Sequence, residues 1–162
     1  MDELIVQGEI SSHILTLCGR QVMIDRDLAK LYNVETKVLN QAVKRNLKRF
    51  PNDFMFLLNA NEKNELVTNC DRFEKLKHST AMPHAFTEQG IYMLATVLKS
   101  DVAIEVNIAI MRTFTKLREF SKHYNALAKQ LIEIDRKHDK QYKELRKALD
   151  ELVSSEENSF SK

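Results

Sequence analysis

The segment from Asp25 to Arg49, DRDLAKLYNVETKVLNQAVKRNLKR, limits the fold more narrowly than any other part of the sequence. Ala29 leaves room for a second helix to approach closely, and Asn33, four residues later, tolerates the left-handed backbone that a tight turn often needs. Val34 would then fill the angle between the two helices. The other residues expected to face the partner helix are Leu28, Tyr32, Leu39, Ala42 and Val43. This spacing predicts a helix-turn-helix.

The expected second helix, about Thr36 to Arg49, is basic and polar on its outer face. Side-chain amides suit the adenine edge, so we expect Asn40 and Gln41 to contact bases. Thr36 and Lys37 lie at the N-terminal end, which usually enters the major groove deepest. The remaining cations are expected to hold phosphates: Lys44, Arg45, Lys48 and Arg49.

The positive charge of the chain is local. The 162 residues carry a formal net charge of only +2. From Lys30 to Arg49, six basic residues stand against one acid, which gives +5 in that window. The rest of the chain is therefore slightly acidic, and any attraction for nucleic acid would be concentrated at the second helix.

Other features exclude several classes of protein. Two cysteines, Cys18 and Cys70, cannot form a secreted disulfide framework, and they indicate free thiols in a reducing cytoplasm. The sequence shows no signal peptide and no apolar run long enough for a membrane span. Cys70, His78 and His84 lack metal-ligand spacing, and there is no glycine-rich phosphate loop. We therefore expect no enzyme, no cofactor and no metal, and a cytoplasmic location.

The segments on either side of the helix-turn-helix predict small β elements. Two β-prone runs within residues 14–24 flank Gly19-Arg20 and predict a hairpin, after which Asp25 would cap the first helix. Pro51 ends the second helix, and Phe54 to Leu58 follows as an apolar strand. This order suggests a winged variant, with Asn52 and Asp53 near the wing tip.

The following region alternates further short elements. We expect a helix over residues 61–69, a loop over 70–82, and a β segment over 84–86. Thr87 would cap a helix over 88–98, and Ser100 would cap another from residue 101 to about 118. The apolar face expected for that last helix comprises Ile104, Ile108, Met111 and Leu117. The predicted fold class is therefore α+β and mostly helical.

Beyond Leu117 the apolar positions follow a heptad spacing, with no glycine or proline from Ile91 onward. This pattern predicts one long helix that pairs with a second copy in a coiled coil. The expected dimer contacts are Leu127, Leu131, Ile134, His138, Leu145 and Leu152, and His138 and Gln141 would form polar layers. We accordingly expect a DNA-binding domain over residues 1–118, a dimerising helix over 119–153 and a flexible tail over 154–162.

Three runs together resemble a known family: DRDLAKLYNVETKVLNQAVKRNLKRFPNDFMF, AFTEQGIYMLATVLKS and AIEVNIAIMRTFTKLR. They are similar to the ORF-six N-terminal domain of phages and prophages, a relative of the KilA-N group, from about Ile10 to Leu117. The resemblance implies a DNA-binding domain of phage regulators, including antirepressor-like proteins. The DNA-reading positions that it implies are Lys37, Asn40, Gln41, Lys44 and Arg45. Residues 66–84 depart from the family, because they lack its Arg-Ser-Gln and Arg-Arg elements.

Two functions are compatible with these patterns. The first is a dimeric, sequence-specific double-stranded DNA-binding protein that regulates transcription in a prophage. The alternative is an antirepressor-like protein that captures a repressor, or another regulatory protein, through its C-terminal helix. Burial of the stripe from Leu117 to Leu152 in a homodimer would favour the first function, and its exposure in a monomer would favour the second.

Overall fold

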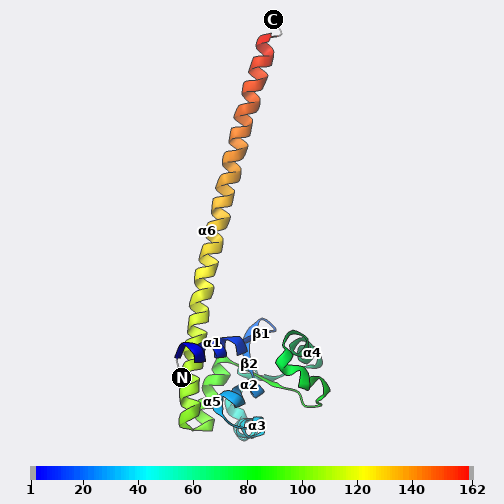
Figure 1. The fold of residues 1–162 in the computed structure, drawn as a ribbon, viewed down its shortest axis with the longest axis vertical. Helices are drawn as coiled ribbons and strands as arrows, with labels where there is room; N and C mark the ends of the chain where they lie inside the picture. Colours follow the sequence, from blue (N-terminus) through cyan, green and yellow to red (C-terminus); the bar gives the residue numbers. More distant parts are fainter. Residues whose placement is uncertain (1–2, 161–162) are drawn as a thin grey trace. The chain divides into compact units, whose positions relative to one another are not determined.

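The computed structural model describes residues 3–160, with side chains from residue 8 to residue 157. The chain divides after Lys116 into two units. The first contains every strand of the described chain and most of its helices (Figure 1), and the second consists of helix alone. We had placed this boundary near residue 118. Together the units form a mostly helical α+β protein with a small antiparallel sheet and a long C-terminal helix, as predicted.

A four-stranded antiparallel sheet of order β1-β2-β4-β3 organises the first unit (Figure 1). Its strands are β1 (Leu15–Leu17), β2 (Arg20–Ile24), β3 (Met55–Leu57) and β4 (His84–Thr87). The predicted hairpin is confirmed, but its two-residue turn is Cys18-Gly19, with φ of 53° and 74°. Positive φ at both positions suits the right-handed twist of the flanking strands.

The predicted wing, a hairpin directly after the second helix, is absent from the described residues. β3 pairs with β4, which lies beyond α4 (Ala60–Asn69) and the 3-10 segment η2 (Asp71–His78). Asn52 and Asp53 therefore lie in an exposed turn before β3, not at the tip of a wing hairpin. A hydrogen bond connects this turn to the end of β4: the Thr87 hydroxyl donates to the carbonyl oxygen of Asp53 at 2.8 Å.

The two faces of the sheet contribute to two apolar clusters, as the alternation of side chains along a strand requires. Met23 and Phe86 join the cluster of the helix-turn-helix, α5 (Glu88–Leu98) and the first turns of α6 (Asp101–Phe160). Val22, Ile24 and Ala85 face the cluster formed with α4 and η2. The helix-turn-helix is therefore fixed to one face of the sheet only.

Several boundaries differ from the prediction. An unpredicted helix, α1 (Glu3–His13), precedes the sheet. Residues 70–82, expected as a loop, contain η2, because Phe73 and Leu76 are buried three residues apart. Asp25 is the first residue of its helix rather than the cap, which is Ile24 and makes no side-chain cap hydrogen bond.

Thr87 and Ser100 cap their helices as predicted, with Gly90 N at 3.5 Å from Thr87 Oγ1 and Ala103 N at 3.1 Å from Ser100 Oγ. The helix that Ser100 begins, α6, runs without a break to Phe160, past residue 153 where we had expected it to end.

The buried face of α6 within the first unit was predicted wrongly. Ile104 and Ile108 are 46% and 47% exposed. The side chains turned into the core are Ala103, Asn107, Ile110 and Phe114, at helical spacing. Asn107 can be buried there because both ends of its side-chain amide are hydrogen-bonded. Its Nδ2 donates to the Ile91 carbonyl at 2.7 Å, and its Oδ1 accepts from the Tyr32 hydroxyl. Burial raises the pKa of Tyr32 although the bond to Asn107 opposes it, so this phenol stays a donor.

Candidate nucleic-acid interface

Two helices joined by a tight turn form where the spacing predicts them. Helix α2 (Asp25–Tyr32) ends at Asn33, which adopts the left-handed conformation with φ 57° and ψ 45°. The amide of Val34 then donates to the Ala29 carbonyl at 2.9 Å, and that of Asn33 to Lys30 at 3.1 Å. These paired bonds satisfy carbonyls that the helix end would leave open. The turn therefore fixes where α3 begins.

Helix α3 (Thr36–Arg45) is four residues shorter than predicted. Asn46 leaves the helical region, and its side chain donates to the Ala42 carbonyl at 2.8 Å, which satisfies the helix end. Leu47–Arg49 then forms a separate 3-10 turn, η1. Lys48 and Arg49 are thus on a different element from the other expected contact residues. Arg49 also donates to Thr96 Oγ1 on α5 at 3.0 Å.

The buried face of α3 consists of Leu39 and Val43. The opposite face exposes Lys37, Val38, Gln41, Lys44 and Arg45, while Thr36 is half-buried. Val38, which is 47% exposed, was missed by the sequence reasoning. Its position, three residues before Gln41 and seven before Arg45, could have placed it on this face. Four polar residues and one apolar residue thus form the face that a ligand could reach.

Asn40 lies in a different environment from its neighbour Gln41. Its Nδ2 donates to Asp25 Oδ2 at 3.0 Å, and its Oδ1 is buried with no hydrogen-bond partner among the described residues. Asp25 is only 3% exposed. The Asn40 amide is therefore already used inside the protein, where it joins the two helices of the motif.

Asp25 gathers contacts from two other segments, α3 and β4. Besides Asn40, the His84 amide donates to Oδ2 at 3.3 Å, and His84 Nδ1 lies 3.5 Å from the same oxygen. Nδ1 of that imidazole makes no hydrogen bond to a described residue, so its contact with Asp25 is an ion pair only when the ring is protonated. Burial works to raise the pKa of Asp25, but the contacts with His84 and Asn40 together hold it below its usual value. The carboxylate therefore stays charged at neutral pH.

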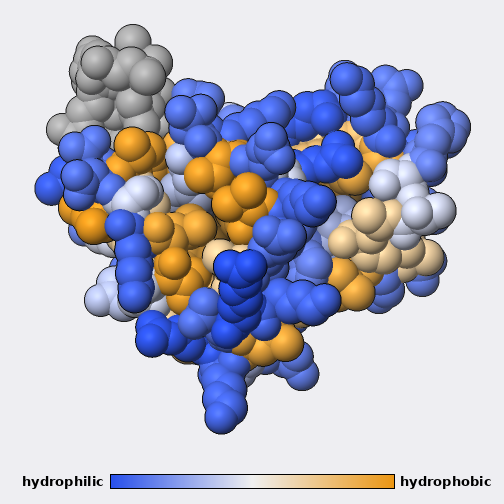
Figure 2. Space-filling model, turned by 90° about the horizontal axis from the view of Figure 1, so that it is seen from below, coloured by the Kyte–Doolittle hydropathy of each residue, from blue (hydrophilic) through white to orange (hydrophobic). Residues whose placement is uncertain are grey.

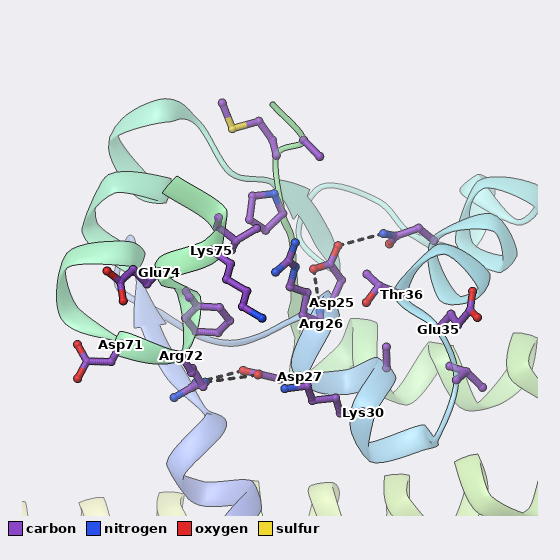
Figure 3. Close-up of a pocket in the computed structure, with 18 residues that line it drawn as sticks. Asp25, Arg26, Asp27, Lys30, Glu35, Thr36, Asp71, Arg72, Glu74 and Lys75 are labelled. Atoms are coloured by element: carbon purple, nitrogen blue, oxygen red, sulfur yellow. Dashed lines mark hydrogen bonds and ion pairs between the residues drawn. The ribbon is translucent and has the colours of Figure 1, made fainter. Parts of the chain in front are cut away.

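Two hollows border the motif. The larger, about 770 Å³, separates α2 and the start of α3 from η2. Figure 3 shows Arg72 reaching Asp27 across it, with Nη2 to Oδ2 at 3.1 Å, and Lys75 extending into it. Four cations and five acids line this cleft: Arg26, Lys30, Arg72 and Lys75 against Asp25, Asp27, Glu35, Asp71 and Glu74. This slight excess of acidic side chains does not favour the binding of a polyanion.

The smaller hollow, about 420 Å³, runs along one side of α3, where that helix borders β3 and β4. No acid lines it, and its residues are Lys37, Asn40, Gln41, Val43, Lys44, Leu47, Met55 and His84. Figure 2 views the first unit from the end at which α3 and α5 lie, and shows hydrophilic side chains around separate apolar patches. Of the two hollows, this one combines cations, an amide and apolar atoms without an acid.

Three further findings concern metal sites, thiols and membrane spans among the described residues. No group of three or more His, Cys, Asp or Glu side chains could hold a metal ion in the part of the chain from residue 3 to residue 160. Cys18 and Cys70 are both free thiols. None of the described helices has the length and apolar character needed to cross a membrane.

Comparisons with known proteins give one match. The model of the ORF6N domain matches residues 12–97, more than half of the chain. No curated protein and no solved structure matches. The matched residues include β1, β2, the whole helix-turn-helix, β3, β4 and most of α5.

Proposed function

The chain belongs to the ORF6N domain family, and from that premise we propose that it binds double-stranded DNA through the exposed face of α3. We propose a prophage-type transcriptional regulator that acts as a homodimer and catalyses no reaction. The observation that carries the proposal is the acid-free face of Lys37, Gln41, Lys44 and Arg45 on the second helix of the motif.

The side chains of this face divide by chemistry. Gln41 can pair its amide with the adenine edge, because its side chain is exposed and, unlike that of Asn40, makes no hydrogen bond to another described residue. Val38 offers an apolar surface suited to a thymine methyl group. Lys37, Lys44 and Arg45, with Lys48 from η1, supply charge for phosphates. In this proposal Asn40 positions α3 against Asp25 and does not contact a base.

The salt dependence of binding tests the proposal. Each phosphate contact contributes about one unit to the slope of log K against log salt concentration. We expect Lys44→Ala to reduce that slope by about one unit and to weaken binding to all duplexes alike. The matched control is Lys129→Ala, a lysine exposed on α6. Equal effects of both substitutions would contradict the assignment of the surface.

A second function, capture of a regulatory protein by α6, is favoured by one observation. Most apolar side chains of α6 beyond Lys116 are exposed in the single chain, as shown by Leu127 at 60% and Leu145 at 62%. Sedimentation of the purified protein discriminates the two proposals. A homodimer would cover this stripe with a second copy, whereas a stable monomer would leave it for another partner.

A further inference from the structure

The charges and polar layers of α6 determine how a second copy would pair with it. From Leu117 the core positions of the heptad alternate at spacings of three and four residues up to Leu152. Most of these positions carry apolar side chains that are at least half exposed in the single chain. His138 and Gln141 interrupt the apolar series in two successive layers.

We propose that α6 forms an antiparallel coiled coil with a second copy of this chain, in the register that places His138 level with Gln141 of the second copy. The proposal rests on the homodimer of the proposed function and adds its orientation and register. In this register His138 of each copy faces Gln141 of the other, so the two-fold symmetry gives two adjacent polar layers at the centre. Neither polar side chain then faces an apolar one. A polar residue at a core position sets register in this way because a mismatched layer would bury it unpaired.

The layers on either side of that centre are apolar in this register. Ile134 faces Leu145 of the second copy, Leu131 faces Ala148, and Leu127 faces Leu152. The symmetry of the pair repeats each contact, so six apolar layers flank two polar ones. Small Ala148 opposite larger Leu131 is an ordinary pairing for facing core layers.

The flanking charges agree with the antiparallel orientation. In antiparallel coiled coils, g positions face g positions, and here Lys137 faces Glu144 of the second copy on both sides of the polar centre. A parallel pair in register would instead bring each g position beside an e position five residues further on. Lys137 would then meet Tyr142, Glu144 would meet Leu149, and Glu151 would meet Glu156, so that no opposite charges pair and one like pair forms.

The covered start of the seam is not needed in this register. Toward its N-terminus the seam continues into Ile110 and Thr113, which are 0% and 3% exposed because the first unit already covers them. The apolar and polar layers of the pairing lie between Leu127 and Leu152, so they use none of these covered positions.

Distances between spin labels test the orientation in the full-length protein. The native cysteines are first replaced, by Cys18→Ser and Cys70→Ser, and one label is attached at Asp150→Cys. In an antiparallel pair the two labels of the dimer are offset by about 32 Å along the coiled-coil axis, whereas in a parallel pair they lie level. A label at Lys140→Cys is the matched control, because its copies lie nearly level in both orientations. Distances at Asp150 no longer than those at Lys140 would overturn the antiparallel orientation while leaving the dimer intact.

A charge exchange tests the register. Lys137→Glu and Glu144→Lys each turn two opposite-charge contacts into like-charge ones, so we expect each to raise the dissociation constant of the dimer about 10-fold. The double variant should restore it, because the exchanged charges face each other again. Additive effects of the two substitutions would overturn this register. A monomeric protein would overturn both this inference and the proposed homodimer, whatever its binding to DNA.

Discussion

Asn40 and Gln41 are adjacent in sequence and chemically similar, yet the structure predicts opposite phenotypes for their replacement by alanine. Asn40→Ala removes a hydrogen bond to the buried carboxylate of Asp25. Such bonds to charged groups contribute about 1.5–3 kcal/mol. The lower end applies, since the substitution also removes the buried, unpartnered Oδ1 of Asn40. Gln41→Ala removes an exposed side chain and should change stability by less than about 0.5 kcal/mol.

The expected shift in melting temperature follows from the size of the first unit. An unfolding entropy of about 2.1 cal/mol/K per residue over roughly 116 residues gives about 4 °C per kcal/mol. Asn40→Ala should therefore lower the melting temperature by about 6 °C, and Gln41→Ala should leave it within about 2 °C. Thermal unfolding followed by circular dichroism measures both. If Asn40→Ala has the melting temperature of the wild type but no longer discriminates between DNA sequences, Asn40 contacts bases and the assigned structural role is wrong.

The same contact predicts a pH dependence. The folded-state pKa of Asp25 lies below its usual value of 3.8. A depressed carboxyl pKa contributes stability above the unfolded pKa, and that contribution is lost as pH falls through the folded value. The difference in stability between wild type and Asn40→Ala should therefore be full at pH 7 and shrink below about pH 4. A difference that grows in acid would contradict the assigned role of the carboxylate.

Two further substitutions test the packing of the first unit. Gly90→Ala should destabilise the protein by about 1–3 kcal/mol or more, although alanine favours helices, because the added Cβ would overlap the backbone carbonyl of Phe54. Gly8→Ala is the control. Nothing lies within 4 Å of the Cβ added there, so this substitution should be neutral or stabilising. Tyr32→Phe should cost about 1–3 kcal/mol, because it leaves the buried oxygen of Asn107 without its donor. Tyr142→Phe, at an exposed tyrosine, is its control and should not change the melting temperature. The packing described would be contradicted if Gly90→Ala melted at the same temperature as Gly8→Ala, or Tyr32→Phe at the same temperature as Tyr142→Phe.

The elements predicted well from sequence are those whose signals are local. The turn at Asn33 could be predicted because the residue type and the apolar spacing on both sides agree, and its φ of 57° confirms the reason. The caps at Thr87 and Ser100 were predictable for the same reason. The continuity of α6 follows from the absence of glycine and proline over its whole length.

The features that were missed depend on partners distant in sequence. The burial of Asn107 on α6 was missed because its hydrogen-bond partner Tyr32 lies 75 residues away in the sequence. Asn40 looked like a base-reading amide because nothing local indicates its bond to Asp25. Helix α1 was missed for a different reason: of its residues with described side chains, only Ile10 is buried, so no apolar stripe marks it.

Selection from a random duplex pool tests whether the exposed face of α3 recognises a DNA sequence. Purified protein and the Gln41→Ala variant would each be incubated with the pool at two salt concentrations, and the bound fraction sequenced. We expect an enriched motif with two-fold symmetry for the wild type, and loss of preference at defined positions for the variant. Binding without enrichment, or the same motif from both proteins, would contradict it.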